Sequence, residues 1–126
     1  MGTPLQDARA HLGKAQEFLA AAESEASAER FNAATSNAVL SGINSKDVIC
    51  LTLTGITGKG EDHRSAVSEL KRSGKAGADL APTLERLLRL KTRAQYQTGS
   101  MAKKDAKSAV RWASQLHEAA QRIVGA

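Results

Sequence analysis

The chain has 126 residues, of which 52 are apolar, which fits one domain with one core. Alanine accounts for 23 of the apolar residues and aromatic residues for only 4, a composition that favours closely packed helices over a β-sheet. No apolar run approaches the roughly 18 residues of a transmembrane helix, and the N-terminus resembles no targeting segment. The lone Cys50, in an apolar run, excludes an internal disulfide and is expected to be a small buried hydrophobe. We therefore expect a soluble cytoplasmic protein without membrane association.

The net charge of +5 is unevenly distributed along the chain. Residues 1–70 hold 6 Lys or Arg against 9 Asp or Glu, whereas residues 71–111 hold 11 against 3. This asymmetry predicts a polyanion or an acidic protein as the partner of the C-terminal half. The alternative is a solvated basic face without a ligand.

Apolar periodicity predicts two long helices in the first half of the chain. Apolar residues recur at steps of three and four from Leu5 to Ala26, with Pro4 placed in the first turn. Ser27 is expected to cap a second helix over about residues 28–54, which is apolar on most sides and therefore central. In that helix Gly42 either weakens the helix or admits a close neighbour. Three polar residues of the same helix require hydrogen-bond partners: Asn37, Asn44 and Asp47.

The second half predicts three further helices. Residues 55–61 form a glycine-rich loop, and Asp62 is a good N-cap for a short helix after it. Residues 74–77 are expected to form a flexible break, and Pro82 to open a fourth helix. Residues 97–100 interrupt the chain before the last helix. The prediction is an all-α, up-and-down bundle of four to five helices that forms a single domain over residues 1–126.

Several kinds of site are excluded by spacing. The glycine-rich loop lacks the glycine five residues before Gly58 and the Ser or Thr after Lys59 that a phosphate-binding P-loop needs. No Cys or His spacing suits zinc, no Gly-x-Ser-x-Gly motif marks a serine nucleophile, and no cofactor is expected. A metal site assembled from distant carboxylates remains open.

Basic residues recur at helical spacing on the fourth and fifth helices. Such rows could line a groove for a phosphodiester backbone, and the alternative is an ordinary solvated face. The first row consists of Arg86, Arg89 and Arg93, and the second of Lys104, Lys107 and Arg111.

Two residues are candidates for proton transfer. His63 follows Asp62 at the start of the third helix, where an imidazole could exchange protons near neutral pH, or could simply fix the loop or lie in solvent. Tyr96 ends the basic fourth helix, where it could stack on a base, act as an acid or base, or cover the helix end. As a hypothesis, His63 or Tyr96 moves the proton, and Lys91 or Arg93 supplies a fixed cation.

Three blocks together resemble the HEPN superfamily, particularly its small single-domain members. The blocks are residues 31–47, residues 57–67 and residues 87–96 followed by Asp105-Ala106. The resemblance implies a helical bundle that usually dimerises and often binds RNA or nucleotides. In the active branch it implies a metal-independent endoribonuclease, commonly a toxin beside a nucleotidyltransferase antitoxin or part of phage defence.

The family's catalytic motif is an arginine, four to six residues, and a histidine. Laid over the fourth helix, this motif falls on Lys91 and Tyr96, so the chain departs from it at both positions. A literal match, Arg111 to His117, lies in the last helix instead. The preferred interpretation is a dimeric HEPN-like protein that binds RNA, with cleavage left open. The alternative is a non-catalytic module that binds an acidic partner such as a nucleotidyltransferase-type antitoxin. The alanine-rich faces of the first, second and fifth helices predict the homodimer.

Overall fold

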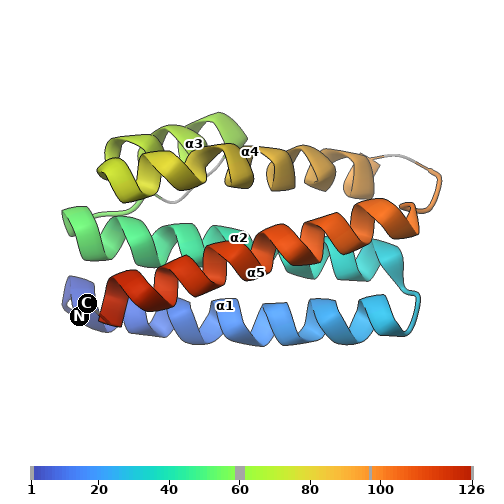
Figure 1. Cartoon of the computed structure of the whole chain (residues 1–126), viewed down its shortest axis with the longest axis horizontal. Helices are drawn as coiled ribbons and strands as arrows, with labels where there is room; N and C mark the ends of the chain where they lie inside the picture. The colour runs from blue at the N-terminus through green and yellow to red at the C-terminus, as the bar shows by residue number, and fades with distance from the viewer. Residues whose placement is uncertain (1, 59–61, 97, 126) are drawn as a thin grey trace.

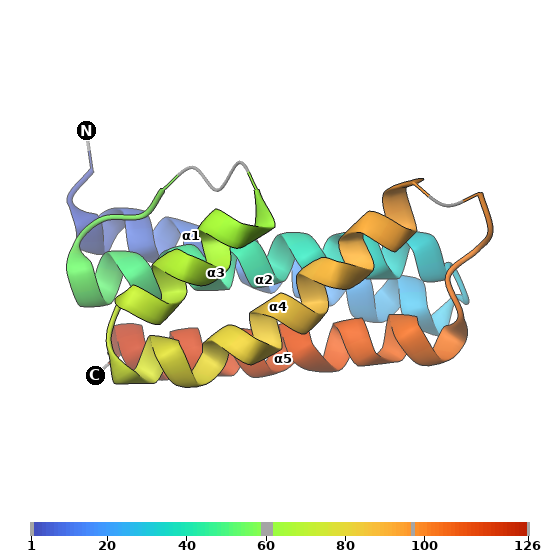
Figure 2. The same ribbon diagram turned by 90° about the horizontal axis from the view of Figure 1, so that it is seen from above.

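The protein is a bundle of helices. The computed structural model describes residues 2–58, 62–96 and 98–125, apart from the side chains of Gln95 and Tyr96. Over these residues it contains no strand, and the helices are α1 (Pro4–Ser27), α2 (Phe31–Thr54), α3 (His63–Arg72), α4 (Lys75–Tyr96) and α5 (Lys103–Gly125). The α1, α2 and α5 helices run lengthwise together, and α3 and α4 cover α2 on the side away from α1 (Figures 1 and 2). The prediction of an all-α bundle is confirmed.

The α2 helix is the centre of the bundle, because it contacts each of the other four helices. A Cβ atom at Gly42 would collide with the Leu87 side chain of α4 and lie 3.4 Å from Leu116 Cδ1 of α5. The glycine therefore lets α2 approach two neighbours closely. This confirms the second of the two interpretations of Gly42.

Side-chain capping sets the starts of α1 and α3. The Thr3 hydroxyl accepts a hydrogen bond from the Gln6 N–H at 3.1 Å, and the Gln6 side chain accepts one from the Thr3 N–H at 2.9 Å. The predicted cap of α3 is confirmed, because the Asp62 carboxylate accepts from the Ser65 N–H at 2.7 Å. The expected role of Ser27 is wrong, since Ser27 is the last residue of α1. The chain turns through Glu29, which has a φ of 61°, and α2 begins only at Phe31.

The start of α4 also differs from the prediction. The helix begins at Lys75, and Pro82 lies inside it. The Ala78 N–H already donates to the Gly74 carbonyl at 2.9 Å, so the helical turn is closed before the proline. Gly77 is buried, and a Cβ atom there would collide with the Leu70 carbonyl and the Ser73 hydroxyl. This glycine lets α4 pass close to the end of α3 and does not form a flexible break.

The core is built from thin side chains, as the composition predicts. Alanines of α1 and α5 pack in it together with leucines of α4, and Ala15, Ala113 and Leu84 are fully buried. Cys50 is 2% exposed, and burial raises the pKa of its thiol to about 11, so the prediction of a small buried hydrophobe is confirmed. Within the described part of the chain, no helix is both long enough and apolar enough to cross a bilayer.

Candidate functional site

A buried cation connects α2 with α3. The Lys46 side chain is 1% exposed, and its ammonium donates to Asp47 Oδ1 at 3.0 Å, Thr57 Oγ1 at 3.0 Å and Glu69 Oε2 at 2.8 Å. Burial lowers the pKa of Lys46, but the two carboxylates outweigh it and raise the pKa above the ordinary value. All three N–H donors of the ammonium are satisfied, so the residue remains charged inside the fold.

Thr57 and Gly58 of the glycine-rich segment contact the groups around this cation. The Thr57 hydroxyl donates to Asp47 Oδ1 at 2.6 Å, and the Gly58 N–H donates to Glu69 Oε2 at 2.7 Å. A Cβ atom at Gly58 would collide with the Glu69 carboxylate, so the glycine is required for this hydrogen bond. Residues 57 and 58, α2 and α3 are therefore held as one polar unit.

The polar unit extends to α1 through His11. The Asn44 amide donates to the Leu40 carbonyl at 2.9 Å, which leaves its Oδ1 to accept from His11 Nδ1 at 2.8 Å. His11 Nδ1 also lies 3.7 Å from Asp47 Oδ2. Asn44 and Asp47 thus have the partners that their positions in α2 require, whereas Asn37 is only half-buried.

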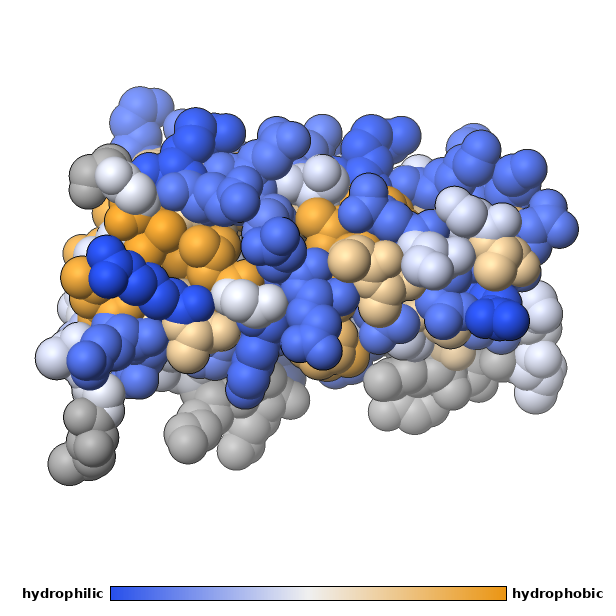
Figure 3. All heavy atoms as spheres, turned by 90° about the horizontal axis from the view of Figure 1, so that it is seen from below, coloured by the Kyte–Doolittle hydropathy of each residue, from blue (hydrophilic) through white to orange (hydrophobic). Residues whose placement is uncertain are grey.

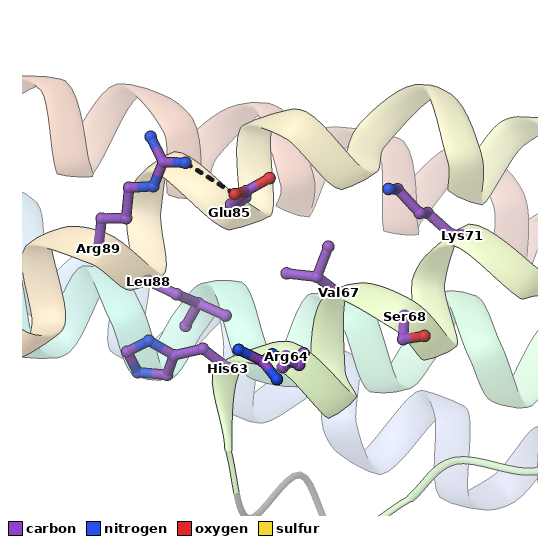
Figure 4. A pocket seen from close by; sticks show the side chains of 8 residues that line it. All are labelled: His63, Arg64, Val67, Ser68, Lys71, Glu85, Leu88 and Arg89. Atoms are coloured by element: carbon purple, nitrogen blue, oxygen red, sulfur yellow. Dashed lines mark hydrogen bonds and ion pairs between the residues drawn. The ribbon is translucent and has the colours of Figure 1, made fainter.

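A second group of charges surrounds an open pocket between α3 and α4. The pocket has a volume of about 360 Å³, and Val67 and Leu88 are its apolar residues. Figure 4 shows side chains from both helices around it, with the Arg89 side chain of α4 extending toward Glu85 of the same helix. Three permanent cations line the pocket against one carboxylate: Arg64, Lys71 and Arg89. Its lining is therefore both apolar and net positive.

His63 lies at the edge of the same pocket, at the first position of α3. Burial lowers the pKa of its imidazole, and the positive charge of the nearby Lys91 lowers it further, while Asp62 opposes the change. The ring is therefore neutral at neutral pH and can accept a proton. The charge of Lys91 thus acts on His63, and these are two of the four residues proposed for proton transfer and charge stabilisation.

The other two proposed catalytic residues are placed differently. Arg93 forms an ion pair with Asp105 at 3.2 Å, which joins α4 to α5. This guanidinium is therefore committed to a structural contact. Tyr96 ends α4, and its side chain lies outside the described residues.

The three arginines of the basic row lie on one exposed side of α4, because steps of three and four residues keep their side chains within about 60° of one another. Arg89 lines the pocket and pairs with Glu85 at 2.8 Å. Arg86 is exposed and lies seven residues before Arg93, which puts it on the same side of α4 as Arg93. On α5, Lys104 and Lys107 are exposed, and the Arg111 guanidinium lies 6.0 Å from the centre of the Trp112 ring.

The literal Arg-to-His match in α5 brings no exposed pair together. His117 is 7% exposed, and burial lowers the pKa of its imidazole. Its Nε2 has no hydrogen-bond partner among the described residues. Arg111 is exposed, so the two side chains lie in different environments.

Several residues that build these sites were not predicted as site residues from the sequence. Arg64 and Lys71 are seven residues apart and therefore share a side of α3, a spacing visible in the predicted short helix. Lys46 lies in α2, the helix predicted to be central, where a long charged side chain signals a buried partner. Glu69 gives no comparable signal, because its role depends on how α3 packs against α2.

No protein-family model matches this chain, and neither does any curated protein. Among the residues that the structure describes, no group of three or more His, Cys, Asp or Glu side chains is arranged to hold a metal ion. The resemblance to the HEPN superfamily therefore remains a prediction from the three sequence blocks.

Proposed function

We propose that the chain is an RNA-binding protein of the HEPN type and that it binds single-stranded RNA at the pocket between α3 and α4. The observation that carries this proposal is that Arg64, Lys71 and Arg89 line one cavity, with His63 in the same lining. Guanidinium and ammonium groups are the usual protein ligands of phosphate oxygens. The apolar side chains of Val67 and Leu88 add a surface on which a base can lie.

The size of the pocket favours a single strand over a duplex. A volume of about 360 Å³ accommodates a nucleotide, and ligand pockets commonly begin near 300 Å³. Bases are free to enter such a pocket only when they are not paired, as in loops and single strands. We therefore expect weak binding to double-stranded RNA.

Fluorescence anisotropy with a labelled single-stranded RNA tests the proposal. The triple variant Arg64→Ala, Lys71→Ala, Arg89→Ala is expected to bind at least about tenfold more weakly in low salt, with a shallower dependence on salt concentration. The control variant is Arg9→Ala, Lys14→Ala, Arg122→Ala. Like the pocket variant it removes two arginines and one lysine, here from exposed positions on α1 and α5. Equal loss in both variants would point to a non-specific effect of net charge, and full binding by the pocket variant would exclude this site.

Metal-independent cleavage is the second candidate function, and the position of His63 in the lining of the charged pocket favours it. A neutral imidazole can take the proton of a 2′-hydroxyl, and a nearby ammonium can stabilise the charge that develops on the phosphate. RNA incubated with the protein in EDTA is expected to be cut by the wild type and not by His63→Ala or Lys91→Ala. An uncut RNA profile for the wild type would remove cleavage and leave the binding proposal standing.

An acidic protein, such as a nucleotidyltransferase-type antitoxin, is the alternative partner. The exposed Lys104 and Lys107 of α5 favour it, since they lie outside the pocket lining. If Lys104→Ala, Lys107→Ala reduces binding of an acidic protein while RNA binding at the pocket is unchanged, the two functions belong to different surfaces.

We also propose a homodimer. Seen from the side of α1, apolar side chains gather between α1 and α5 towards the end where α1 begins and α5 ends (Figure 3). Leu5 of α1 is 45% exposed, and Ile123 and Val124 of α5 are only partly buried. A second copy would cover such a surface. Light scattering at micromolar concentration is expected to give twice the 13.3 kDa of one chain, and a monomer mass would exclude the dimer.

A further inference from the structure

We propose that the pocket between α3 and α4 selects guanine, and that Glu85 is the residue that reads the base. This inference rests on the proposed RNA binding at the same pocket. The Glu85 carboxylate lines the same cavity as Arg64, Lys71 and Arg89. A negative charge is not expected in a site that binds only an anion.

A carboxylate in a phosphate-binding pocket repels the phosphate. Its ion pair with Arg89 is a helical i,i+4 pair between exposed side chains, which are 49% and 73% exposed, so the pair contributes little to stability. The position of the Glu85 carboxylate in the pocket is therefore better explained if the ligand has a group that donates hydrogen bonds to it. In Figure 4, Glu85 lies opposite Val67, across the pocket.

The apolar and charged residues suit different parts of one nucleotide. Val67 and Leu88 provide the surface for a base, and the three cations provide ligands for the phosphate. A base that lies against Val67 directs an edge toward Glu85 on the opposite helix.

Guanine is the base whose edge fits a carboxylate best. Its ring N1–H and exocyclic amine are adjacent donors, and the two carboxylate oxygens can accept both. The Arg89 contact is to Oε1 alone, so Oε2 and the second lone pair of Oε1 remain for the base. Adenine and cytosine each present one exocyclic amine beside a ring nitrogen that accepts hydrogen bonds. The lone pair of that nitrogen and a carboxylate oxygen repel each other. Hypoxanthine keeps N1–H and lacks the amine.

Titration with mononucleotides, followed by NMR, tests the selection. The wild type is expected to bind guanosine 5′-monophosphate about tenfold more tightly than inosine or adenosine 5′-monophosphate, as one bidentate contact provides. Glu85→Gln is expected to abolish this preference. The control is Asp79→Asn, which removes the charge of another exposed i,i+4 pair of α4, Lys75–Asp79, outside the pocket lining, and is expected to keep the preference.

The two explanations of Glu85 give opposite results. If Glu85 only supports the helix, removal of its negative charge strengthens binding of all three nucleotides alike. If Glu85 reads guanine, guanosine monophosphate loses affinity relative to the other two. Equal affinities in the wild type, a preference that survives Glu85→Gln, or no mononucleotide binding at all would overturn the inference. RNA binding measured by anisotropy on the same samples shows separately whether the proposed function stands.

Discussion

The Lys46 ammonium of α2 lies 2.8 Å from the Glu69 carboxylate of α3, although 23 positions separate the two residues in the chain. Asp47 and Thr57 complete the surroundings of the ammonium, so the charge has a full set of partners. The α3 helix also carries His63 and Arg64 at the edge of the pocket. The orientation of the pocket therefore depends on an ion pair that lies outside its lining.

Replacement of Lys46 should strongly destabilise the fold. Lys46→Met leaves the carboxylates of Asp47 and Glu69 without their cation, and we expect the free energy of unfolding to fall by about 3 kcal/mol. Urea denaturation followed by circular dichroism measures the change. Lys75→Met, at a side chain that is 91% exposed, should change the free energy of unfolding by less than about 0.5 kcal/mol. Equal effects of the two variants would contradict the structural role of Lys46.

The Glu69 carboxylate should make part of the stability dependent on pH. Burial opposes its ionisation, but hydrogen bonds from Lys46 and Gly58 outweigh burial and lower its pKa below the ordinary value of 4.5. A lowered pKa stabilises the folded state above about pH 4.5, and this contribution is lost as the pH falls through the folded-state pKa.

Glu69→Gln should therefore cost stability at pH 7 and less at pH 3. The two urea midpoints, measured for wild type and variant at both pH values, should converge in acid. If the difference between the two urea midpoints is the same at both pH values, the contribution of Glu69 to stability does not depend on its ionisation.

The imidazole of His63 should titrate below its ordinary pKa of 6.5, because burial and the Lys91 charge both disfavour its protonated form. Lys91→Ala should move the midpoint upward, and burial should keep it from reaching the ordinary value. NMR chemical shifts of the ring protons measure the midpoint. Arg93→Ala serves as the control, since Arg93 pairs with Asp105. If Lys91→Ala leaves the titration midpoint of His63 unchanged, the Lys91 charge does not act on His63.

Two glycines inside helices should respond to alanine in opposite directions. At Gly13 of α1 nothing lies within 4 Å of an added Cβ atom, so Gly13→Ala should stabilise the fold by about 0.5–1 kcal/mol through helix propensity. At Gly77 the added atom meets the Leu70 carbonyl, and Gly77→Ala should destabilise the fold by about 2 kcal/mol. Thermal denaturation compares the two variants, and stabilisation by both would mean that α3 and α4 can separate without cost.

Helices and caps that depend on residues close together in the chain were predictable from the sequence. Asp62 was correctly identified as a cap because its hydrogen bond to Ser65 spans three residues. Gly77 and Pro82 were misinterpreted for the opposite reason. The need for glycine at position 77 comes from Leu70 and Ser73, and Pro82, which was expected in a first turn, lies inside a helix that begins at Lys75.

The candidate site was predictable only in its parts. His63, Arg89 and Lys91 were candidates by residue type and spacing, but the pocket that His63 and Arg89 line depends on how α3 and α4 pack. The row of Arg86, Arg89 and Arg93 was expected to act together, whereas Arg89 lines the pocket and the Arg93 guanidinium pairs with Asp105 of α5. Lys46 was passed over because a lysine is rarely buried.

The single thiol of Cys50 is 2% exposed, and its pKa is raised to about 11, so at neutral pH it is almost entirely protonated and shielded from reagents. Maleimide dyes should therefore leave the wild-type chain unlabelled. A cysteine introduced at an exposed position, such as Lys75→Cys, would take up one dye per chain, which gives a direct optical reporter without prior removal of the native sulfur.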